Sequence, residues 1–552
     1  MSEALAALRL RPVGDAALTA ELGDRLDPVA NSWIRALDRA LLEHPFPGFV
    51  ESVPTHRSLL VCFDPAQTSF AAAAEAVGQG STRAILRMEP GRLHEIAVHY
   101  GGEDGPDLEG VAARAGLSAA EVVRLHSGQE YDAFMLGFLP GFAYLGLLPE
   151  RLDTPRLATP RTRVPAGSVA IAGRLTGIYP APTPGGWRIV GRAAVRLFDV
   201  SRQPPSLFSP GDRVRFVPVE ALEEPRSAGP TPPRRIGTPS RGGPIVEVIS
   251  AGLLTTVQGR PRQGHRRFGV AGAGALDPGA LAAANIALGN PEDAPGLECT
   301  LLGPSLRFLR LTRFAVAGAD LEARLERADM GSWPVPSASP VLARAGNLLT
   351  FGAPRAGCRA YLAFEGGLDV PLVLGSPSTD LMGGFGGLAG RALLEGDILA
   401  AGPPGDRRLP PRAPDSTAPA GRAMGTVGSD GTDEVTARVV PGPQDHHFPA
   451  AAMETLLHTA FTVGAASDRI ACRLEGATLT HAGPNEIVSD GMVPGVIQVP
   501  PDGRPIVMLA DGPTTGGYPK IATVVTSDLP RLAQRVPGVG RVRFALFDRD
   551  ER

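Results

Sequence analysis

The chain has 552 residues, too many for one hydrophobic core and typical of two to four folded units of about 150 residues each. Its 43% hydrophobic and 20% charged residues are those of a globular protein, and 68 glycines with 55 prolines favour strands and turns. The net charge of −3 and the scattered arginines argue against a nucleic-acid partner.

No segment predicts a membrane span or a secretory signal. The first residues carry Glu3, Arg9 and Arg11 where a signal would need an apolar run, and no later stretch reaches about 18 consecutive apolar residues. We therefore expect no membrane partner and a cytoplasmic protein. The four cysteines lie far apart and form no CxxC pair, so we interpret them as reduced core residues, namely Cys62, Cys299, Cys358 and Cys472.

The predicted elements are mainly strands. Alternating or β-branched runs bounded by Gly and Pro predict strands at 92–100, 167–173, 495–500, 505–510 and 541–547. Helices are predicted at 107–116, at 118–128 with Ser118 as N-cap, and at 277–290 with Asp277 as N-cap and Pro278 in the first turn.

Two stretches are poor in apolar residues and rich in Pro, Gly and charge. Residues 223–243 are typical of an exposed linker, so we predict one module at 1–222 and a second at 244–552. Residues 402–436 are expected to form a mobile loop inside the second module. The similar segments 166–191 and 494–524 suggest two related β-domains whose Gly-Gly-aromatic loops face one cleft.

The first module contains several candidate functional residues. His126 ends a predicted helix and is a candidate proton shuttle, although a buried histidine with one hydrogen bond is the structural alternative. Arg161, with Arg156 and Arg163, precedes a small-residue turn at Ser168, where guanidinium groups and open amides suit an anion. The segment from Tyr179 through Gly185 and Gly186 to Trp187 allows close approach of a ligand, or forms a plain hairpin.

The second module contains the chain's single lysine, Lys520, in the stretch DGPTTGGYPK. A lysine changes its pKa when buried, unlike arginine, so a lone lysine beside an acid and a flexible turn is a candidate for chemistry. Asp511 and Lys520 are the predicted proton-transfer groups and Gln498 an amide-binding group. The expected substrate-binding residues are Arg469, Arg473, Thr514, Thr515, Gly516, Gly517 and Tyr518.

Arg469 and Arg473 lie four positions apart, so they share a face if helical and separate if the backbone bends. The adjacent His446 and His447 lack the spacing of metal ligands, so no metal site is predicted. The sequence also lacks a G-x-x-x-x-G-K-[ST] phosphate loop, a biotin-attachment motif and an amidase signature.

Long motifs in both modules resemble a known family. LHSGQEYDAFMLGFLPGFAYLG and VPAGSVAIAG in the first module resemble KipI, also called the B subunit of 5-oxoprolinase or allophanate hydrolase subunit 1. EGGLDVPLVLGSPSTDL and SDGMVPGVIQVPPDGRPIVMLADGPTTGGYPKIATVV in the second resemble KipA, or the C subunit of 5-oxoprolinase. The resemblance covers nearly the whole chain apart from the linker and the 402–436 loop.

The resemblance implies a mainly β fold with some α, built on two cyclophilin-like β-barrels in tandem. It implies the fused B and C subunits of an ATP-dependent 5-oxoprolinase, which would act with a separate A subunit to open 5-oxoproline to glutamate. ATP with Mg²⁺ is the implied cofactor, at a site that the sequence does not locate, and no biotin is attached to this chain. A homo-oligomer remains open.

On this interpretation, Arg473 or Arg469 holds the substrate carboxylate, Gln498 holds the amide, and Lys520 neutralises charge during phosphoryl transfer. Two alternatives remain. The same modules occur in the carboxyltransferase region of urea carboxylase, in the urea amidolyase family, which would need biotin on another polypeptide. KipI and KipA also act as a kinase regulator and its antagonist.

The chain departs from the family pattern near the start of the second module. The family's Val-Gln-Asp-x-Gly-Arg is Val257-Gln258-Gly259-Arg260-Pro261-Arg262 here, and its Gly-Val-Pro-x-Ser-Gly is replaced at 269–274. The loss of the acid and of the second glycine leaves open what the 257–274 segment does and whether the protein keeps its activity.

Overall fold

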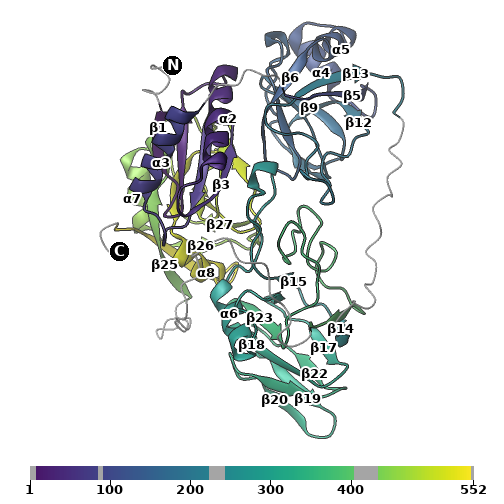
Figure 1. Ribbon diagram of the computed structural model, residues 1–552, viewed down its shortest axis with the longest axis vertical. Coiled ribbons are helices and arrows are strands. Elements are labelled where there is room, and N and C mark those ends of the chain that lie inside the picture. The colour runs from purple at the N-terminus through teal and green to yellow at the C-terminus, as the bar shows by residue number, and fades with distance from the viewer. Residues whose placement is uncertain (1–7, 85–90, 223–242, 403–432, 549–552) are drawn as a thin grey trace.

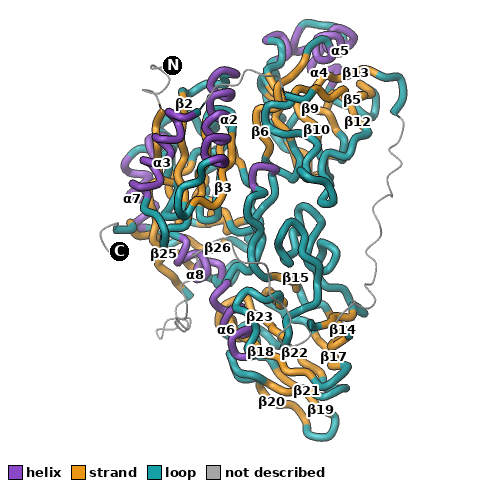
Figure 2. The backbone as a smooth tube through the Cα atoms, in the orientation of Figure 1, coloured by secondary structure: helices purple, strands orange, loops and turns teal. Residues whose placement is uncertain are grey.

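The computed structural model describes residues 8–84, 91–222, 243–402 and 433–548, which form four folded units (Figure 1). Strands outweigh helices throughout (Figure 2). The linker expected at 223–243 and the loop expected at 402–436 lie almost entirely outside the described residues. No helix in the described ranges combines the length and hydropathy needed to cross a bilayer.

The N-terminal unit, residues 8–84, is a four-stranded antiparallel sheet in the order β1-β2-β4-β3 with two helices on one face. Asp27 caps the first helix by accepting a hydrogen bond from the Val29 N–H, and Pro28 occupies its first turn. Apolar side chains of both helices pack on the sheet. Its elements are β1 (Leu8–Pro12), β2 (Ala17–Leu22), α2 (Pro28–Glu43), β3 (Phe49–Pro54), β4 (Ser58–Phe63) and α3 (Phe70–Arg83).

The first barrel follows at residues 91–218 and closes in the order β10-β7-β6-β13-β5-β12-β9. Ser118 forms a capping box with Glu121 at the start of α5, which confirms the predicted N-cap. Its elements are β5 (Leu93–Tyr100), α4 (Leu108–Ala115), α5 (Ala119–Ser127), β6 (Glu130–Leu136), β7 (Ala143–Gly146), β8 (Arg161–Val164), β9 (Ser168–Ala172), β10 (Leu175–Ile178), β11 (Thr183–Gly185), β12 (Arg188–Ala193) and β13 (Arg213–Pro218).

The two-sheet unit, residues 244–402, stacks a six-stranded and a five-stranded sheet around one apolar core. Asp277 caps α6 and Pro278 begins it, as predicted. Its elements are β14 (Pro244–Ser250), β15 (Leu254–Gln258), α6 (Pro278–Ala287), β16 (Gly296–Thr300), β17 (Ser305–Phe308), β18 (Thr312–Asp320), β19 (Arg324–Arg327), β20 (Gly331–Pro334), β21 (Val341–Ala343), β22 (Leu348–Thr350), β23 (Ala356–Phe364) and β24 (Ile398–Ala400).

The second barrel, residues 434–546, closes in the order β25-β32-β29-β30-β27-β26-β33. Its elements are β25 (Glu434–Pro441), α7 (Ala450–His458), β26 (Phe461–Val463), β27 (Ala471–Glu475), β28 (Asp490–Gly491), β29 (Val496–Gln498), β30 (Ile506–Met508), β31 (Thr515–Gly516), β32 (Lys520–Val524), α8 (Leu529–Ala533) and β33 (Arg541–Leu546). In both barrels the first strand pairs in parallel with the last, β5 with β13 and β25 with β33. This shared topology supports the expectation of two related β-domains.

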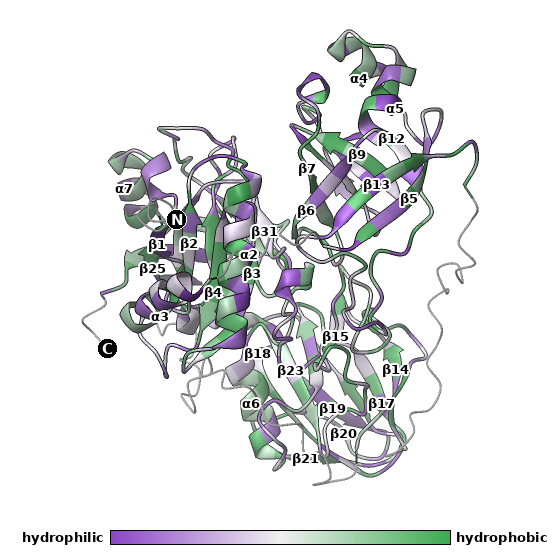
Figure 3. Ribbon diagram, turned by 45° about the horizontal axis from the view of Figure 1, so that its top comes forward, coloured by the Kyte–Doolittle hydropathy of each residue, from purple (hydrophilic) through white to green (hydrophobic). Residues whose placement is uncertain are grey.

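The N-terminal unit packs against the second barrel, which lies at the other end of the chain (Figure 1). The face of its sheet opposite the helices contributes Ala17, Leu60 and Cys62 to an apolar cluster with Met492 and Met508. Thr526 of the second barrel also donates a hydrogen bond to Asp15. Green apolar segments of the N-terminal sheet accordingly lie inside the molecule in Figure 3. The fold therefore brings the first and last thirds of the sequence together.

Candidate functional site

Lys520 lies buried in the second barrel, with none of its surface exposed. Its Nζ donates a hydrogen bond to Oδ2 of Asp490 at 2.8 Å. The local strands explain this pairing, since β32 runs beside β29 with Lys520 opposite Gln498, and β28 runs beside β31 with Asp490 opposite Gly516. The chain's only lysine is therefore half of a buried ion pair beside the DGPTTGGYPK loop.

The partners of Asp490 come from the N-terminal sheet. Ser58 at the start of β4 donates a short hydrogen bond to its Oδ1. Gln444 reaches both Asp490 and Glu21, with its Nε2 3.4 Å from Asp490 Oδ2 and 3.3 Å from Glu21 Oε1. Burial raises the pKa of Asp490, but the charge and hydrogen bond of Lys520 outweigh it and hold that pKa below its ordinary value.

The pKa of Glu21 is shifted in the opposite direction, above its ordinary value. Burial and the nearby charge of Asp490 raise its pKa, and Arg57, Lys520 and Arg11 lower it by less. The two carboxyl groups therefore differ in proton affinity although they share Gln444 and Lys520. Of these two residues, Glu21 therefore holds a proton more readily than Asp490 does.

The N-terminal unit and the two barrels meet at a junction around His56, Tyr144, Asp490 and Thr515. His56 lies on the turn between β3 and β4 and is the most unusual of these residues. It is 1% exposed, and neither ring nitrogen has a hydrogen-bond partner among the described residues. The ring lies edge-on to Phe134 and Tyr144 of the first barrel, at centroid distances of 5.5 and 5.7 Å. Burial, aided by Arg57, lowers the pKa of His56 to about 3, so the imidazole is neutral near pH 7.

Asn31 fixes the turn that carries this ring. Its Nδ2 lies 2.8, 3.2 and 3.1 Å from the carbonyl oxygens of Thr55, His56 and Phe134. One buried side chain therefore ties the N-terminal unit to the first barrel directly behind the imidazole. Buried polar groups are hydrogen-bonded in the great majority of cases, so the two nitrogens of this rigidly held imidazole make His56 a candidate for binding a polar ligand.

The first barrel meets the second at Thr515. The Phe138 N–H donates to Thr515 Oγ1 at 3.1 Å, and the side chains of Thr515 and Ser489 are close enough to the Tyr144 hydroxyl to lower its pKa, although burial raises that pKa overall. A Cβ at Gly137 would overlap Thr515, so this approach of the two loops requires glycine. Thr514 beside it is buried, and its hydroxyl has no partner among the described residues.

An aromatic cluster supports Tyr144 from behind. Phe142 packs between Tyr179 and Trp187 with ring centroids 5.3 and 5.5 Å away. Gly185 leaves room for the Tyr179 hydroxyl, and the carbonyl of Gly186 accepts a hydrogen bond from the Leu157 N–H at 2.7 Å. Tyr179, Gly185, Gly186 and Trp187 therefore belong to this cluster or adjoin it, whereas Gly516 and Gly517 lie beside Asp490 and Ser489. That the two Gly-Gly loops face one cleft stays a prediction.

Arg156 lies at the edge of the junction and is exposed to solvent. A side chain at Gly517 would meet Ser489 Oγ at 3.5 Å and Arg156 Nη2 at 3.9 Å. The charge of Arg156 also acts on the Tyr144 hydroxyl. None of the described carboxylates forms an ion pair with it, so this guanidinium is available to an anion at the junction.

Three predicted residues of the first barrel lie elsewhere. His126 is enclosed in that barrel, where Tyr100 and Thr176 hydrogen-bond its two ring nitrogens at 2.7 and 2.9 Å. Burial lowers its pKa to about 3. Arg161 pairs with Asp107 at 2.8 Å, and Ser168 is buried in β9. The structure therefore gives His126 the satisfied structural role that the sequence left as its alternative.

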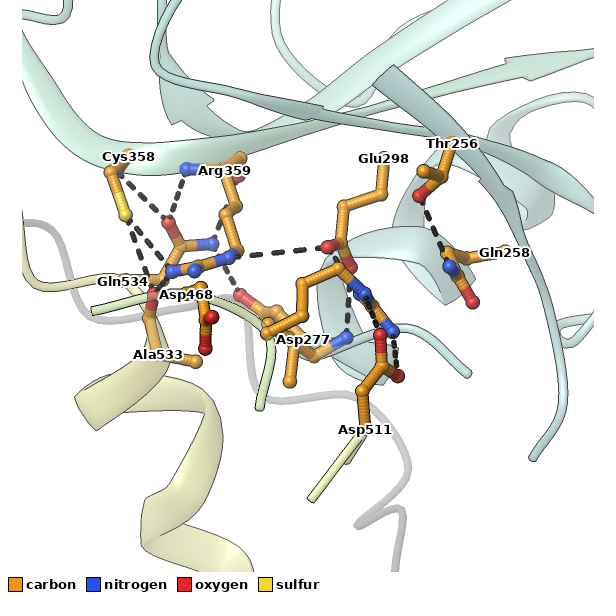
Figure 4. Close-up of polar contacts among 12 residues, drawn as sticks. Thr256, Gln258, Asp277, Glu298, Cys358, Arg359, Asp468, Asp511, Ala533 and Gln534 are labelled. Carbon is orange, nitrogen blue, oxygen red and sulfur yellow. Dashed lines mark hydrogen bonds and ion pairs between the residues drawn. The ribbon is translucent and has the colours of Figure 1, made fainter. Parts of the chain in front are cut away.

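Arg469 and Asp511 belong to a second buried network, which links Glu298 of the two-sheet unit to Asp511 of the second barrel. Figure 4 shows Glu298 and Asp511 in this network. Nε and Nη2 of Arg469 each lie 2.9 Å from an oxygen of Asp511, and its Nη1 donates to Glu298. Burial lowers the pKa of Arg469, but these carboxylates raise it further, above its ordinary value. Arg469 and Asp511 are thus occupied by each other. Arg469 binds Asp511, Glu298 and the Gly274 carbonyl oxygen, and both oxygens of Asp511 accept from Arg469, so the ion pair occupies the groups that were expected to bind substrate and transfer a proton.

Arg473 does not belong to the buried network of Arg469 and Asp511. It lies on strand β27 and is exposed, whereas Arg469 precedes the strand and is buried. The backbone is extended after a bend, so the second of the two alternatives from the sequence is observed. Gln498 and Tyr518 do lie at the junction, with Gln498 Nε2 3.2 Å from the Tyr518 carbonyl oxygen.

The segment where the chain departs from its family, 257–274, runs between all four units. Arg266 pairs with Glu51 at 3.1 Å and Arg267 with Asp38 at 2.6 Å in the N-terminal unit. The Gly141 N–H of the first barrel donates to the Phe268 carbonyl, and the Ala273 N–H donates to Ala510 of the second. Its observed contacts are therefore structural. Within the described ranges, no three His, Cys, Asp or Glu side chains are grouped to hold a metal ion.

Comparison with known proteins matches both halves of the chain. A family model described as carboxyltransferase domain, subdomain C and D, matches residues 8–208, and one described as subdomain A and B matches residues 268–546. The chain is 40% identical over 291 residues to the 5-oxoprolinase C subunit of Escherichia coli (strain K12), covering 52% of this chain and 87% of that protein.

It is also 43% identical over 206 residues to the 5-oxoprolinase B subunit of Escherichia coli O157:H7, covering 37% of this chain and 94% of that protein. The crystal structure of TTHA0988 superposes with a TM-score of 0.79 at 35% identity, covering 97% of this chain and 100% of that one. This chain belongs to the carboxyltransferase-domain family that includes the B and C subunits of 5-oxoprolinase.

Proposed function

We propose that this chain is the fused B and C component of an ATP-dependent 5-oxoprolinase. It would activate 5-oxoproline for ring opening to glutamate, together with a separate A subunit. The observation that carries the proposal is the tandem similarity, in which one half resembles a B subunit over 94% of its length and the other resembles a C subunit over 87%.

The junction geometry supports the same proposal. Its residues come from both halves, with His56 and Tyr144 in the first and Asp490, Thr515 and Lys520 in the second. Where B and C are separate polypeptides, such a site would form only on assembly. In the fused chain it forms within one polypeptide.

The chemistry of 5-oxoproline fits the groups present. The substrate carries a carboxylate, which Arg156 at the edge of the junction would bind. It also carries a lactam N–H, which can donate a hydrogen bond to the neutral imidazole of His56. The hydroxyls of Thr514 and Tyr144 can orient the lactam carbonyl oxygen. The Lys520–Asp490 pair would then hold in place the loop that carries Thr514 and Thr515, and it would put a buried pair of opposite charges next to that loop.

Activation would begin at the lactam oxygen. This oxygen bonds to the γ-phosphorus of ATP while the bond from that phosphorus to the β,γ-bridging oxygen breaks, which releases ADP. The lactam N–H proton leaves to a base, for which His56 is the candidate. Water then adds to the activated carbon, and the C–N bond opens as the ring nitrogen takes up a proton, which leaves an acyl phosphate on the side chain. A second water hydrolyses this acyl phosphate to glutamate and phosphate. We assign both steps to the A subunit.

The site for ATP is not assigned to residues. The chain has no phosphate-binding loop of the G-x-x-x-x-G-K-[ST] type, and the described residues have no acidic or His/Cys cluster that fits Mg²⁺. The ATP dependence therefore rests on the relationship to the 5-oxoprolinase subunits.

The test is a coupled assay with the full chain, a 5-oxoprolinase A subunit, ATP and 5-oxoproline. ADP and glutamate are expected in equal amounts, and omission of either protein should abolish glutamate formation. Absence of both products with an active A subunit would reject the proposal.

A second candidate is a carboxyltransferase acting with biotin on another polypeptide. The observation that favours it is the description of both matching family models as carboxyltransferase domains. Transfer of carboxyl from carboxybiotin to urea, with no turnover of 5-oxoproline, would support this candidate over the first.

A further inference from the structure

A cavity of about 270 Å³ lies between the N-terminal unit, the segment 259–282 and the second barrel. It is separate from the junction described above. Glu51 and Cys62, which face each other on β3 and β4, lie at the cavity, whereas Ser58 at the opposite end of β4 binds Asp490. The same sheet face therefore meets the junction at one end and this cavity at the other.

The walls are mostly apolar and come from three units. Val13 and Phe63 belong to the N-terminal unit, Leu281 to α6, and Leu509 and Leu529 to the second barrel. Burial raises the pKa of Cys62 to about 12, so its thiol is uncharged here. An engineered apolar cavity of about 150 Å³ is known to bind benzene, so this one has room for an apolar body nearly twice that size.

Arg266 gives the cavity a preference for a ligand with an anionic group. Its backbone N–H and its Nε lie 3.2 and 3.1 Å from the two carboxylate oxygens of Glu51. Its terminal nitrogens make no hydrogen bond to any described residue, and Nη2 lies 3.2 Å from the position of a Cβ at Gly272, which also lines the cavity. A side chain at position 272 would therefore be in tight contact with that nitrogen.

Four residues with carboxylates line the cavity, namely Asp15, Glu51, Glu292 and Asp293. Both oxygens of Glu51 are held by Arg266, and Asp15 accepts hydrogen bonds from the N–H and hydroxyl of Thr526. A guanidinium with two unused nitrogens beside an apolar chamber matches a carboxylate head on an apolar tail.

We propose that this cavity binds a small monocarboxylate with an apolar body, its carboxylate on Arg266 and its body among the apolar walls. Because the walls belong to three units, such a ligand stabilises their arrangement by mass action and acts on the junction from a distance. The site is distinct from the one proposed for 5-oxoproline.

The test is calorimetric titration of the full chain with octanoate, and with octanol as a probe of equal length without charge. Octanoate is expected to bind one site, at least tenfold more tightly than octanol. Ala282→Leu fills the cavity from α6 and should weaken octanoate at least tenfold, whereas Ile286→Phe, at an exposed position of the same helix, should not. Retained melting temperature shows that each variant is folded.

Absence of octanoate binding, equal binding of octanol, or unchanged binding by folded Ala282→Leu would overturn the proposal. If Ala282→Leu does not fold, Arg266→Gln with octanoate and octanol replaces it, and loss of the preference for octanoate is then expected. Titration with 5-oxoproline separates this site from the junction. Competition between 5-oxoproline and octanoate would mean that the cavity is a substrate site, whereas failure of the glutamate assay would leave octanoate binding unaffected.

Discussion

Nζ of Lys520 lies 2.8 Å from Oδ2 of Asp490, and both side chains are almost completely buried. The pair belongs to the second barrel, yet Asp490 is also bound by Ser58 of the N-terminal unit. The lone lysine therefore stabilises an interface between sequence-distant units and supports the adjacent loop. It does not project a free ammonium into a pocket between the two barrels.

Removing Lys520 alone should destabilise the protein strongly. Lys520→Met leaves the Asp490 carboxylate buried without its cation, and breaking such a pair costs about 3–5 kcal/mol in the free energy of unfolding. The double variant Lys520→Met/Asp490→Asn should recover most of that loss. Urea unfolding of the two variants measures both effects, and a double variant no more stable than the single one would show that the pair is not the source of the loss.

His56→Phe should lower kcat/KM for 5-oxoproline by about 100-fold or more, because it removes the proton acceptor while keeping an aromatic ring between Phe134 and Tyr144. His126→Asn is the matched control. It breaks contacts inside the first barrel and should lower stability without this loss of kcat/KM. Coupled kinetics of both variants test the difference, and equal kcat/KM for wild type and His56→Phe would remove His56 from the mechanism.

Acidification should destabilise the folded chain below about pH 6.5. The pKa values of His56 and His126 are lowered to about 3 in the fold, so between pH 6.5 and 3 the unfolded chain binds protons that the folded chain does not. Their contribution is complete above pH 6.5 and is lost as the pH falls, at about 1.4 kcal/mol per pH unit for each histidine.

The measurement is the free energy of unfolding from pH 7 to pH 5. His56→Phe should show a shallower decline than wild type, whereas replacing the exposed His44 by Gln should leave the slope unchanged. An unchanged slope in His56→Phe would mean that this histidine is not held neutral.

Arg469→Met and Arg473→Met should differ sharply in stability. The first leaves Asp511 and Glu298 buried without their common partner, at a cost of about 3–5 kcal/mol, while the second changes an exposed strand position within about 0.5 kcal/mol. Thermal unfolding of both variants distinguishes them. Equal stability would contradict the assignment of Arg469 to a buried network.

The sequence predicted local structure well where a signal was contained in a short segment. Ser118, Asp277 and Pro278 begin their helices as predicted, and the strands at 92–100 and 541–547 are present. The N-terminal unit was not predicted as a separate unit, although Asp27-Pro28 begins α2 by the same rule as Asp277-Pro278.

The site was predicted only in part, because its contacts span the whole chain. Lys520, Gln498 and Thr515 share one local segment and its neighbouring strand, and sequence patterns suffice to group them. Asp490 binds Ser58 from 432 positions away, and His56 lies on a turn with no periodic pattern. The sequence indicates Arg156 only as one arginine before an anion-binding turn, and its place beside Gly517 depends on the packing of the two barrels.

The proposed function requires 5-oxoproline to bind at the junction of the N-terminal unit and the two barrels. A crystal structure of the full chain with bound 5-oxoproline tests this placement. The lactam is expected between His56 and Thr515, with the carboxylate within hydrogen-bond distance of Arg156. Ordered 5-oxoproline elsewhere, with an unoccupied junction, would contradict it.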